Sequence, residues 1–511
     1  MMVQNQDWIN QWAIYSPDKI AVKEYETGRA LSYGDLNRMS NRLAHHLQSH
    51  FGIAKGDRIA ILAENCLEYI LLFGAAQKNG CTLVPLNYRL TSAEIDYLLE
   101  DSSPKMVISE TKFQHLLEGA EKYNTIPGKW SIESLMDLCN PLSTQTKEVA
   151  FEMVPLEEDH PIFILYTAGT TGFPKGAIYS HKMLFWNSIN TAMSLIVNSE
   201  SRTVNVMPPF HTGGWNVLLT PFLHHGGYTC LVKKFDPDVV LELLESEKTT
   251  IFMAVPTMLK MIAESPGFDQ ADFSAMYYLI VGGEPMPIPL IEKWQAKGVP
   301  VRQGYGMTEV GPNLTSLHQD DAVRKKGSIG RANFYVRIKI VDDRGKQVSA
   351  NEAGELLLKG PMVTPGYWNH PEATAKTIEN GWFHTGDMVR QDEEGYLYVV
   401  DRIKNMYISG GENVYPAEVE RIILEMPEVS AVAVIGISDP RWGETGKAFI
   451  VKHKGAQIQP EEVIAYCKKK LARFKVPKSV DFLDELPKND AGKLDKRALK
   501  TWAENGPMTT K

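Results

Sequence analysis

The sequence predicts an α/β fold with a large N-terminal domain of α/β sheets, a β-rich subdomain within it, and a small α+β C-terminal domain. Three patterns along the 511 residues support this prediction. Strand-like and helix-like segments alternate from about residue 31, short strands and turns fill residues 327–400, and a new alternation follows residue 402. A single hydrophobic core rarely serves a chain much longer than about 300 residues. We therefore expect an N-terminal domain at residues 1–401 and a C-terminal domain at residues 402–511.

The N-terminal domain begins with a helix whose apolar residues Leu36, Met39, Leu43 and Leu47 fall on one stripe. Apolar runs of strand length then alternate with helical stretches, which is typical of parallel sheets. The predicted strands are 58–62, 82–85 and 105–109, and the predicted helices are 67–78 and 92–99, the second capped by Ser92.

The β-rich subdomain and the C-terminal domain are predicted from shorter signals. Residues 336–341 and 354–358 have the composition of strands. In the C-terminal domain, Pro416 and Pro460 each stand at the start of a helical pattern, where proline is favoured, and a strand is predicted between them at 429–437. No low-complexity linker separates the two domains, so a short hinge should join them.

The composition is that of an ordinary globular chain and excludes several classes of protein. Apolar residues make up 43% and charged residues 23%, and no tract indicates a long disordered tail. The net charge of -8 argues against nucleic-acid binding, which needs clustered lysine and arginine. Neither a secretory leader nor a run of about 18 apolar residues is recognisable. We therefore expect a cytoplasmic protein without a transmembrane segment.

The cysteines indicate a reducing compartment. They are scattered, odd in number and without a C-x-x-C pair, so neither a disulfide framework nor a zinc site is predicted. The five are Cys66, Cys81, Cys139, Cys230 and Cys467.

The segment 166–176, YTAGTTGFPKG, has the composition of a loop that binds nucleotide phosphates. Its glycines let the backbone approach a polyanion, its threonines offer hydroxyl donors, and its lysine supplies charge. A strand at 161–165 before it and a helix capped by Ser180 after it predict the order strand, loop, helix. A Walker loop is excluded because Pro174 precedes the lysine and Gly176 follows it. A plain Gly/Thr loop is the alternative. The candidate phosphate ligands are Thr167, Ala168, Gly169, Thr170, Thr171, Gly172 and Lys175.

Four further segments carry residue types that suit a nucleotide and an acid. PPFHTGGW places His211 beside two glycines and Trp215, an arrangement that suits a carboxylate next to an apolar pocket. GYGMTE offers an aromatic face for a purine, a hydroxyl, and in Glu309 a carboxylate for Mg²⁺. Asp387 ends WFHTGD and can accept ribose hydroxyls, and Lys493 ends the turn LPKNDAGK. Each has a plainer alternative on its own: a packed histidine, a turn with a buried tyrosine, a Thr-Gly-Asp turn, or a solvated loop.

In this order and over this length, the five motifs resemble the AMP-forming adenylating superfamily of acyl-CoA synthetases, peptide-synthetase adenylation domains and firefly-type luciferases. The resemblance covers essentially the whole chain. The segment 401–420 is similar to the hinge of that family and the hairpin after it, and it falls at the boundary that the composition indicates. The resemblance implies that the C-terminal domain is mobile.

The resemblance also implies roles for matching residues around ATP. Tyr305 would stack on adenine, Thr308 would contact the α-phosphate, and Lys493 would reach the substrate carboxylate and the α-phosphate. Ribose would be bound by Asp387 and Arg402. Beyond the phosphate loop, the implied ATP-binding residues are Gly283, Glu284, Tyr305, Gly306, Asp387 and Arg402. The implied catalytic residues are His211, Thr308, Glu309 and Lys493, and the implied Mg²⁺ ligands are Thr171 and Glu309.

Further roles concern CoA, the hinge and the acid. Lys404 would be the pivot, and Gly410 and Gly411 would line the pantetheine path. Arg89 and Arg473 are candidates for the CoA phosphates, although solvated arginines are the plainer interpretation. The acid pocket would be lined by His211, Trp215, Gly282, Gly306 and Val310.

The implied reaction joins a carboxylic acid to CoA through an acyl adenylate, with ATP and CoA as co-substrates and Mg²⁺ as cofactor. The expected pocket positions are small, glycine or apolar, which favours a medium- to long-chain fatty acid, with an aryl acid of the benzoate or cinnamate type as the alternative. A stand-alone adenylation enzyme that delivers to a carrier protein, a light-emitting oxygenase and a non-catalytic nucleotide-binding protein are further alternatives. A peptide-synthetase domain is disfavoured because no aspartate stands at 208–211. A homodimer is left open.

One segment departs from the family pattern. Residues 330–335, GRANFY, replace the Gly-x-Pro-x-Pro-Gly turn common in relatives. Whether this change reshapes the acid pocket or only a surface turn is left open by the sequence.

Overall fold

The computed structural model describes residues 7–139, 150–167, 173–283, 286–409, 412–488 and 494–505. The chain divides into two compact units, one made of residues 1–338 and 358–383 and the other of residues 339–357 and 384–511. The expected boundary at residue 402 stays a prediction.

A six-stranded sheet forms the first layer of the first unit. Its strands are parallel except for the last, which is antiparallel to its neighbour. In sheet order they are β6 (Gly128–Ser131), β5 (Met106–Ser109), β3 (Arg58–Leu62), β4 (Thr82–Pro85), β7 (Pro161–Thr167) and β8 (Lys175–Ser180). Two of the predicted strands, 58–62 and 82–85, are confirmed residue for residue, because both are short apolar runs buried in the sheet.

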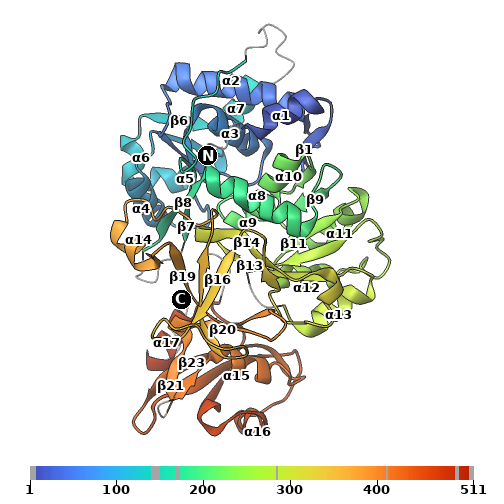
Figure 1. Cartoon of the computed structure of the whole chain (residues 1–511), viewed down its shortest axis with the longest axis vertical. Helices are drawn as coiled ribbons and strands as arrows, with labels where there is room; N and C mark the ends of the chain where they lie inside the picture. Colours follow the sequence, from blue (N-terminus) through green and yellow to red (C-terminus); the bar gives the residue numbers. More distant parts are fainter. Residues whose placement is uncertain are drawn as a thin grey trace. The chain divides into compact units, whose positions relative to one another are not determined.

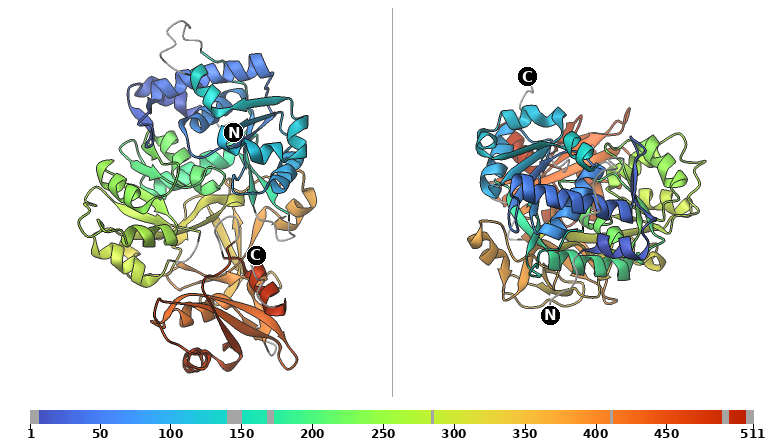
Figure 2. Two further views of the ribbon diagram at one scale, coloured as in Figure 1. Left: turned by 180° about the vertical axis from the view of Figure 1, so that it is seen from behind. Right: turned by 90° about the horizontal axis from the view of Figure 1, so that it is seen from above.

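The helices of this region follow the predicted stripes. The first stripe gives a helix that begins with a capping box between Ser32 and Asp35 and ends at Gly52 in the left-handed conformation. Figure 1 shows the N-terminal helices (blue) beside α8 and α10 (green), and the view from behind in Figure 2 shows the same neighbours. The helices are α1 (Trp8–Tyr15), α2 (Tyr33–Phe51), α3 (Leu67–Asn79), α4 (Ser92–Ser102), α5 (Gln114–Glu118), α6 (Glu121–Thr125), α7 (Ile132–Cys139), α8 (His181–Leu195), α9 (Thr212–Asn216) and α10 (Leu219–His225).

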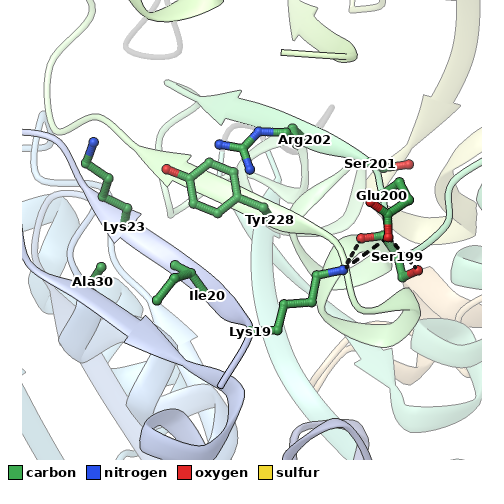
Figure 3. Close-up of a pocket in the computed structure, with 9 residues that line it drawn as sticks. All are labelled: Lys19, Ile20, Lys23, Ala30, Ser199, Glu200, Ser201, Arg202 and Tyr228. Atoms are coloured by element: carbon green, nitrogen blue, oxygen red, sulfur yellow. Dashed lines mark hydrogen bonds and ion pairs between the residues drawn. The ribbon is translucent and has the colours of Figure 1, made fainter. Parts of the chain in front are cut away.

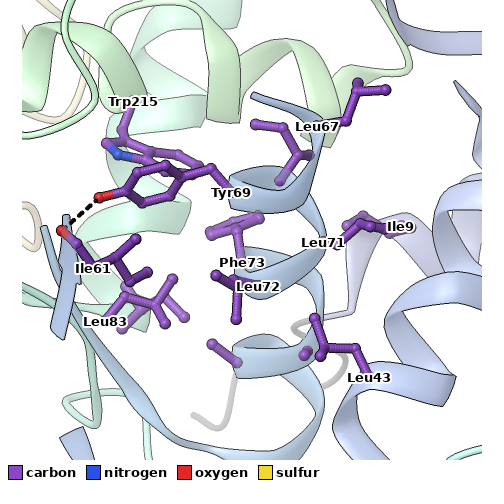
Figure 4. Close-up of a cluster of buried hydrophobic side chains, with 14 of the residues drawn as sticks. Ile9, Leu43, Ile61, Leu67, Tyr69, Leu71, Leu72, Phe73, Leu83 and Trp215 are labelled. Atoms are coloured by element: carbon purple, nitrogen blue, oxygen red, sulfur yellow. Dashed lines mark hydrogen bonds between the residues drawn. The ribbon is translucent and has the colours of Figure 1, made fainter. Parts of the chain in front are cut away.

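Helix α3 lies at the centre of the largest core cluster (Figure 4). All of its residues are buried, because its sequence is apolar on nearly every side. The rings of Tyr69 and Phe73 on this helix lie 5.5 and 5.6 Å from that of Trp215, and Phe163 of β7 lies 5.0 Å from it. This aromatic cluster joins α3, the sheet and α9.

Two predictions for this region are corrected. The phosphate loop does not lead directly into a helix: β8 comes first, antiparallel to β7, and Ser180 then caps α8 by accepting from the amide of Met183 at 3.2 Å. The N-cap of α4 is Thr91, whose hydroxyl accepts from the amide of Glu94, and Ser92 is the first helical residue.

Two smaller sheets complete the first unit. One has the order β2 (Ala30–Ser32), β1 (Ile20–Glu24), β10 (Tyr228–Leu231) and β9 (Arg202–Asn205). The other has the order β11 (Ile251–Ala254), β12 (Tyr278–Val281), β13 (Val301–Met307), β14 (Gly311–Ser316) and β15 (Arg331–Ala332). Helices α11 (Pro237–Ser246), α12 (Pro256–Ala263) and α13 (Ile288–Ala296) share a second core cluster with the strands β11 to β13.

A further sheet contains the β-rich segment. Its strands are β16 (Arg337–Val341), β17 (Ala353–Lys359), β19 (Trp382–Gln391), β18 (Ile378–Glu379) and β20 (Leu397–Arg402), and α14 (Pro371–Thr377) precedes β18. The two strands predicted at 336–341 and 354–358 are confirmed within one residue at each end.

The second unit contains a sheet covered on both faces. Alternate residues of β23 enter different clusters: Val432 and Val434 pack with α15 and α16, and Ala433 and Ile435 pack with α17. The strands are β22 (Glu412–Val414), β21 (Tyr407–Ser409), β24 (Gly443–Lys452), β23 (Val429–Asp439) and β25 (Ser479–Leu483). The helices are α15 (Pro416–Ile423), α16 (Pro460–Lys470) and α17 (Lys496–Asn505), and both proline starts are as predicted. Within the described ranges, no helix has the length and apolar character needed to cross a membrane.

Candidate active site

The ends of two neighbouring parallel strands in the first unit carry predicted site residues. Gly282 and Gly283 follow β12, and Tyr305 lies near the end of β13. Ligands of α/β proteins bind at the carboxyl ends of parallel strands. Gly306 has to be glycine, because a Cβ there would lie 2.0 Å from the carbonyl oxygen of Pro312.

Glu309 is a buried carboxylate, 6% exposed, in the 3-10 turn Thr308–Val310 after β13. Its Oε1 accepts from the hydroxyls of Thr167 at 3.2 Å and Tyr367 at 3.1 Å, and no cationic side chain among the described residues pairs with it. Buried charges are normally compensated by an opposite charge. The described residues contain no group of three or more side chains that could hold a metal by themselves. One carboxylate that lacks a counter-charge fits Mg²⁺, which is usually bound by one or two carboxylates together with substrate phosphates.

The β7–β8 hairpin positions the cationic end of the phosphate loop. Thr167 lies opposite Lys175 in the register, and Lys175 Nζ lies 5.6 Å from the ring centroid of Tyr367. The amide of Trp368 donates to the carbonyl of Gly176 at 2.7 Å, which holds the segment carrying Tyr367 against β8. The hairpin therefore places the hydroxyl of Thr167 against the carboxylate of Glu309 and the ammonium group of Lys175 near the ring of Tyr367.

Sequence reasoning missed Tyr367. Burial, together with the nearby Glu309, raises the pKa of its phenol, so the hydroxyl stays protonated and donates to the carboxylate. The segment PGYW, with a glycine and two aromatic residues, was the signal that the sequence offered. The carboxylate that Tyr367 binds, however, lies 58 residues away in sequence, and only the fold brings the two side chains together.

His211 stands at the N-cap position of the short helix α9. Its ring lies 4.6 Å from that of Phe210, and the guanidinium of Arg89 lies 5.6 Å from the same Phe210 ring. A Cβ at Gly214 would lie 2.3 Å from the carbonyl oxygen of Pro208, so this tight turn requires glycine. The structure thus brings two predicted residues, His211 and Arg89, close to one aromatic ring.

Trp215 and Val310, two expected pocket residues, are fully buried. The indole nitrogen of Trp215 donates to the carbonyl of Pro209 at 2.7 Å, and its ring belongs to the aromatic cluster around α3. Its role in lining an acid pocket stays a prediction.

Behind Val310, a network of buried amides joins α8, α9 and β14. The side-chain amide of Asn313 donates to the hydroxyl of Thr191 and to the carbonyl of Val217, the latter at 3.0 Å. Asn187 donates to the carbonyl of Asn216 at 2.7 Å. All four polar side chains are at most 7% exposed. The interior next to Gly311 and Val310 is therefore polar, and the sequence did not suggest this, because isolated asparagines resemble surface residues.

The unusual turn at 330–335 is tied to this network. Asn333 is buried and donates to the carbonyl of Asn313 at 2.9 Å, and the amide of Tyr335 donates to the side chain of Asn190 at 3.1 Å. Phe334 is exposed. The turn is therefore anchored to β14 and α8 and is more than a surface feature.

In the second unit, the two predicted ribose ligands contact each other. Arg402 Nε lies 2.8 Å from Asp387 Oδ1, across the β19–β20 pair. Lys404, the predicted pivot, is exposed. The neighbouring Asp401 is buried and accepts from the amides of Arg402 at 2.6 Å and Ala417 at 2.8 Å, which fixes the start of α15. Arg473 begins the 3-10 turn Arg473–Lys475 after α16.

Several predicted residues lie outside the described residues. They are Ala168, Gly169, Thr170, Thr171, Gly172, Glu284, Gly410, Gly411 and Lys493. The flanks of Lys493 are described: Lys488 and Leu494 form a β-bridge, and Lys496 lies 2.6 Å from the half-buried Glu420. Both flanks of the lysine are therefore anchored.

A surface pocket of about 400 Å³ lies in the first unit between residues 19–30, 199–202 and 228 (Figure 3). Its cations are already paired, since Lys23 lies 2.6 Å and Arg202 lies 3.3 Å from Glu247, and Lys19 lies 3.8 Å from Glu200. None of the predicted site residues lines it. We therefore assign the chemistry to the strand ends and not to this pocket.

The fold and the motifs define an adenylate-forming enzyme, and the chain belongs to the AMP-binding enzyme family. The family model matches residues 9–368, and the model of the AMP-binding enzyme C-terminal domain matches residues 418–493. A feruloyl-CoA synthase of Amycolatopsis sp is 39% identical over 487 residues, 95% of this chain and 96% of the relative. The long-chain-fatty-acid–CoA ligase FadD13 of Mycobacterium tuberculosis is 36% identical over 502 residues, 98% of each chain. The ATP-bound structure of MatB from Rhodopseudomonas palustris superposes with a TM-score of 0.90 at 32% identity, covering 98% of this chain and 99% of MatB.

These matches confirm the predicted family, the α/β fold with large and small domains, and the enzyme class. The protein is an AMP-forming acid–thiol ligase. The individual site residues stay predictions.

Proposed function

We propose that this ligase activates an aromatic carboxylic acid of the cinnamate type. The observation that carries the proposal is the buried amide network of Asn313 and Asn187 next to Val310, a residue that we predict to line the acid pocket. A long alkyl chain gains only from apolar surroundings, and burying amides beside it adds no recognition. A compact aryl acid needs less depth and has polar substituents that amides can bind. The 39% identical feruloyl-CoA synthase supports this choice.

ATP, CoA and the acid are the substrates. In the first half-reaction the acid carboxylate attacks the α-phosphorus of ATP, and pyrophosphate leaves. Negative charge accumulates between two anions, and we assign Lys175 and Lys493 to offset it. Glu309 holds Mg²⁺, which supplies further positive charge at the phosphates. Asp387 and Arg402 bind the ribose. In the second half-reaction the CoA thiol attacks the acyl adenylate, and AMP leaves.

A panel of acids tests the proposal directly. Pyrophosphate release is measured with ATP, Mg²⁺ and each acid, with and without CoA, for cinnamates, benzoates and saturated fatty acids of increasing length. We expect the highest kcat/KM with a cinnamate and AMP formation that depends on CoA. Efficient turnover of a fatty acid with none of a cinnamate would contradict the aromatic assignment. Adenylate formation without CoA consumption would indicate delivery to a carrier protein.

A medium- to long-chain fatty acid, which the sequence favours, is the second candidate. Its support is the 36% identity to FadD13 and the small or apolar character of the expected pocket positions. We also propose a cytoplasmic location, because Cys66, Cys81, Cys230 and Cys467 are free and buried, as in proteins of reducing compartments.

A further inference from the structure

Arg302 is a buried arginine on β13, three residues before Tyr305, with only 2% of its surface exposed. Every hydrogen bond that its guanidinium donates goes to a neutral acceptor. The acceptors are the carbonyls of Leu317 and Ser194, both at 2.8 Å, the hydroxyl of Ser316 at 2.7 Å and the amide oxygen of Gln319 at 3.2 Å.

The charge of Arg302 has no anionic partner among the described residues. Its guanidinium lies 4.6 Å from the ring centroid of Tyr278, and the exposed Asp320 attracts it only weakly. Burial lowers the pKa of Arg302, because desolvation disfavours the charged form. Buried charges in proteins are usually paired, and leaving one uncompensated is costly. The position therefore favours an electron-rich group from outside the chain.

A small cavity of about 10 Å³ adjoins the guanidinium. Its lining mixes the apolar Leu195 and Ile280 with polar residues, among them Ser194, Arg302, Gln303, Asn313 and Asn333. A space of this size with several polar partners holds one water molecule or one group of similar size. Gly304, which lines the cavity, lies close to Gly282 of the predicted acid pocket, since a Cβ at Gly282 would lie 3.8 Å from the carbonyl of Gly304. The cavity is thus next to the position where the acid is expected.

We propose that this cavity is a subsite for an oxygen substituent on the aromatic ring of the acid, a hydroxyl or phenolate, and that Arg302 determines specificity by donating to that oxygen. The proposal rests on the aromatic acid assigned under Proposed function. The ring oxygen takes the place of a water molecule and supplies the electron-rich partner that the guanidinium lacks. No covalent step is involved.

The test is the ratio of kcat/KM for 4-hydroxycinnamate to that for cinnamate, measured as CoA-dependent AMP formation. Both acids are assayed on the same preparation, so the fraction of active enzyme cancels. A hydrogen bond to a charged group predicts a ratio of about ten or more in the wild type. Arg302→Met should bring the ratio to about 1. The matched control is Arg202→Met, which removes another arginine stacked on a tyrosine, 4.0 Å from the Tyr228 ring, and should keep the wild-type ratio.

A second variant keeps the proposal testable if Arg302→Met does not fold. Arg302 binds the carbonyl and not the side chain of Ser194, so Ser194→Val preserves that bond while filling part of the cavity. It should also bring the ratio to about 1. If Arg302 served only to tie β13 to its neighbours, both acids would lose activity equally and the ratio would not change. A wild-type ratio near 1, or variants that keep the wild-type ratio, would overturn the subsite. If neither aryl acid is used while a fatty acid is, the failure lies in the proposed function, and the subsite falls with it.

Discussion

The buried carboxylate of Glu309 allows a prediction in which stability and activity change in opposite directions. Glu309→Gln removes the charge and keeps the shape. Because a single atom, Oε1, accepts from both Thr167 and Tyr367, the amide oxygen of glutamine can keep both hydrogen bonds. The only loss is a negative charge without a cationic partner among the residues that the structure describes.

The expected magnitudes follow from that geometry. In the absence of nucleotide, relieving an uncompensated buried charge should leave the free energy of unfolding unchanged or raise it by about 1 kcal/mol. Activity should fall, because the residue that we assign to Mg²⁺ no longer carries charge where negative charge develops. Loss of one such electrostatic contribution lowers kcat by about a hundredfold to a thousandfold, about 3 to 4 kcal/mol.

Two assays measure the two effects. Urea unfolding with and without Mg²⁺ and ATP gives the stability and the ligand-induced stabilisation, which should be large in the wild type and small in the variant. Pyrophosphate release with a good acid substrate gives the activity. Tyr367→Phe is the matched control: it leaves the charge and removes one donor, so it should lower the free energy of unfolding by about 1 to 3 kcal/mol. A Glu309→Gln variant that is clearly less stable than wild type yet retains its rate would refute this reasoning.

Two other perturbations have expected outcomes. His181 is fully buried, neither of its ring nitrogens has a hydrogen-bond partner among the described residues, and burial lowers its pKa to about 3. Below about pH 6.5 the imidazole therefore binds a proton in the unfolded chain but not in the folded chain. The free energy of unfolding then falls as the pH drops from about 6.5 toward 3. His181→Phe should reduce this loss of unfolding free energy by up to about 1.4 kcal/mol per pH unit. The measurement is the urea midpoint of both proteins between pH 7.5 and 5.5. An unchanged pH dependence would show that His181 is protonated in the native state. Lys493→Ala should abolish pyrophosphate release from acid and ATP while thioester formation from supplied acyl adenylate persists; equal loss in both half-reactions would exclude the assigned role.

The sequence predicted those parts of the fold that depend on local patterns. The strands β3 and β4 are apolar runs with polar or glycine-containing ends, and α2 has an apolar stripe with a clear capping signal, so local chemistry was sufficient. β8 was missed because its six residues follow the phosphate loop and include a glycine, which weakens a strand pattern. The segment is a strand because it pairs with β7, and this pairing is a tertiary interaction that the local sequence does not reveal.

In the candidate site, too, local motifs could be recognised from the sequence and long-range contacts could not. The motifs carrying Glu309, His211 and Asp387 were recognisable because their residue types suit the chemistry. Tyr367 and the amides around Asn313 were not, because their importance comes from partners far along the chain. The ring of Trp215, which we predict to line the pocket, belongs to the aromatic core around α3, and its role at the pocket stays a prediction.

The first unit is discontinuous, since residues 358–383 return to it after the chain has contributed residues 339–357 to the other unit. During translation the acidic group at position 309 emerges from the ribosome well before the phenol at 367 that donates to it. A nascent chain that stops within the intervening segment holds this carboxylate with one of its two hydroxyl donors missing. The proposed nucleotide site around Glu309 is thus complete only after residues 358–383 have been synthesised. A chain truncated before this segment lacks the phenol that donates to the carboxylate.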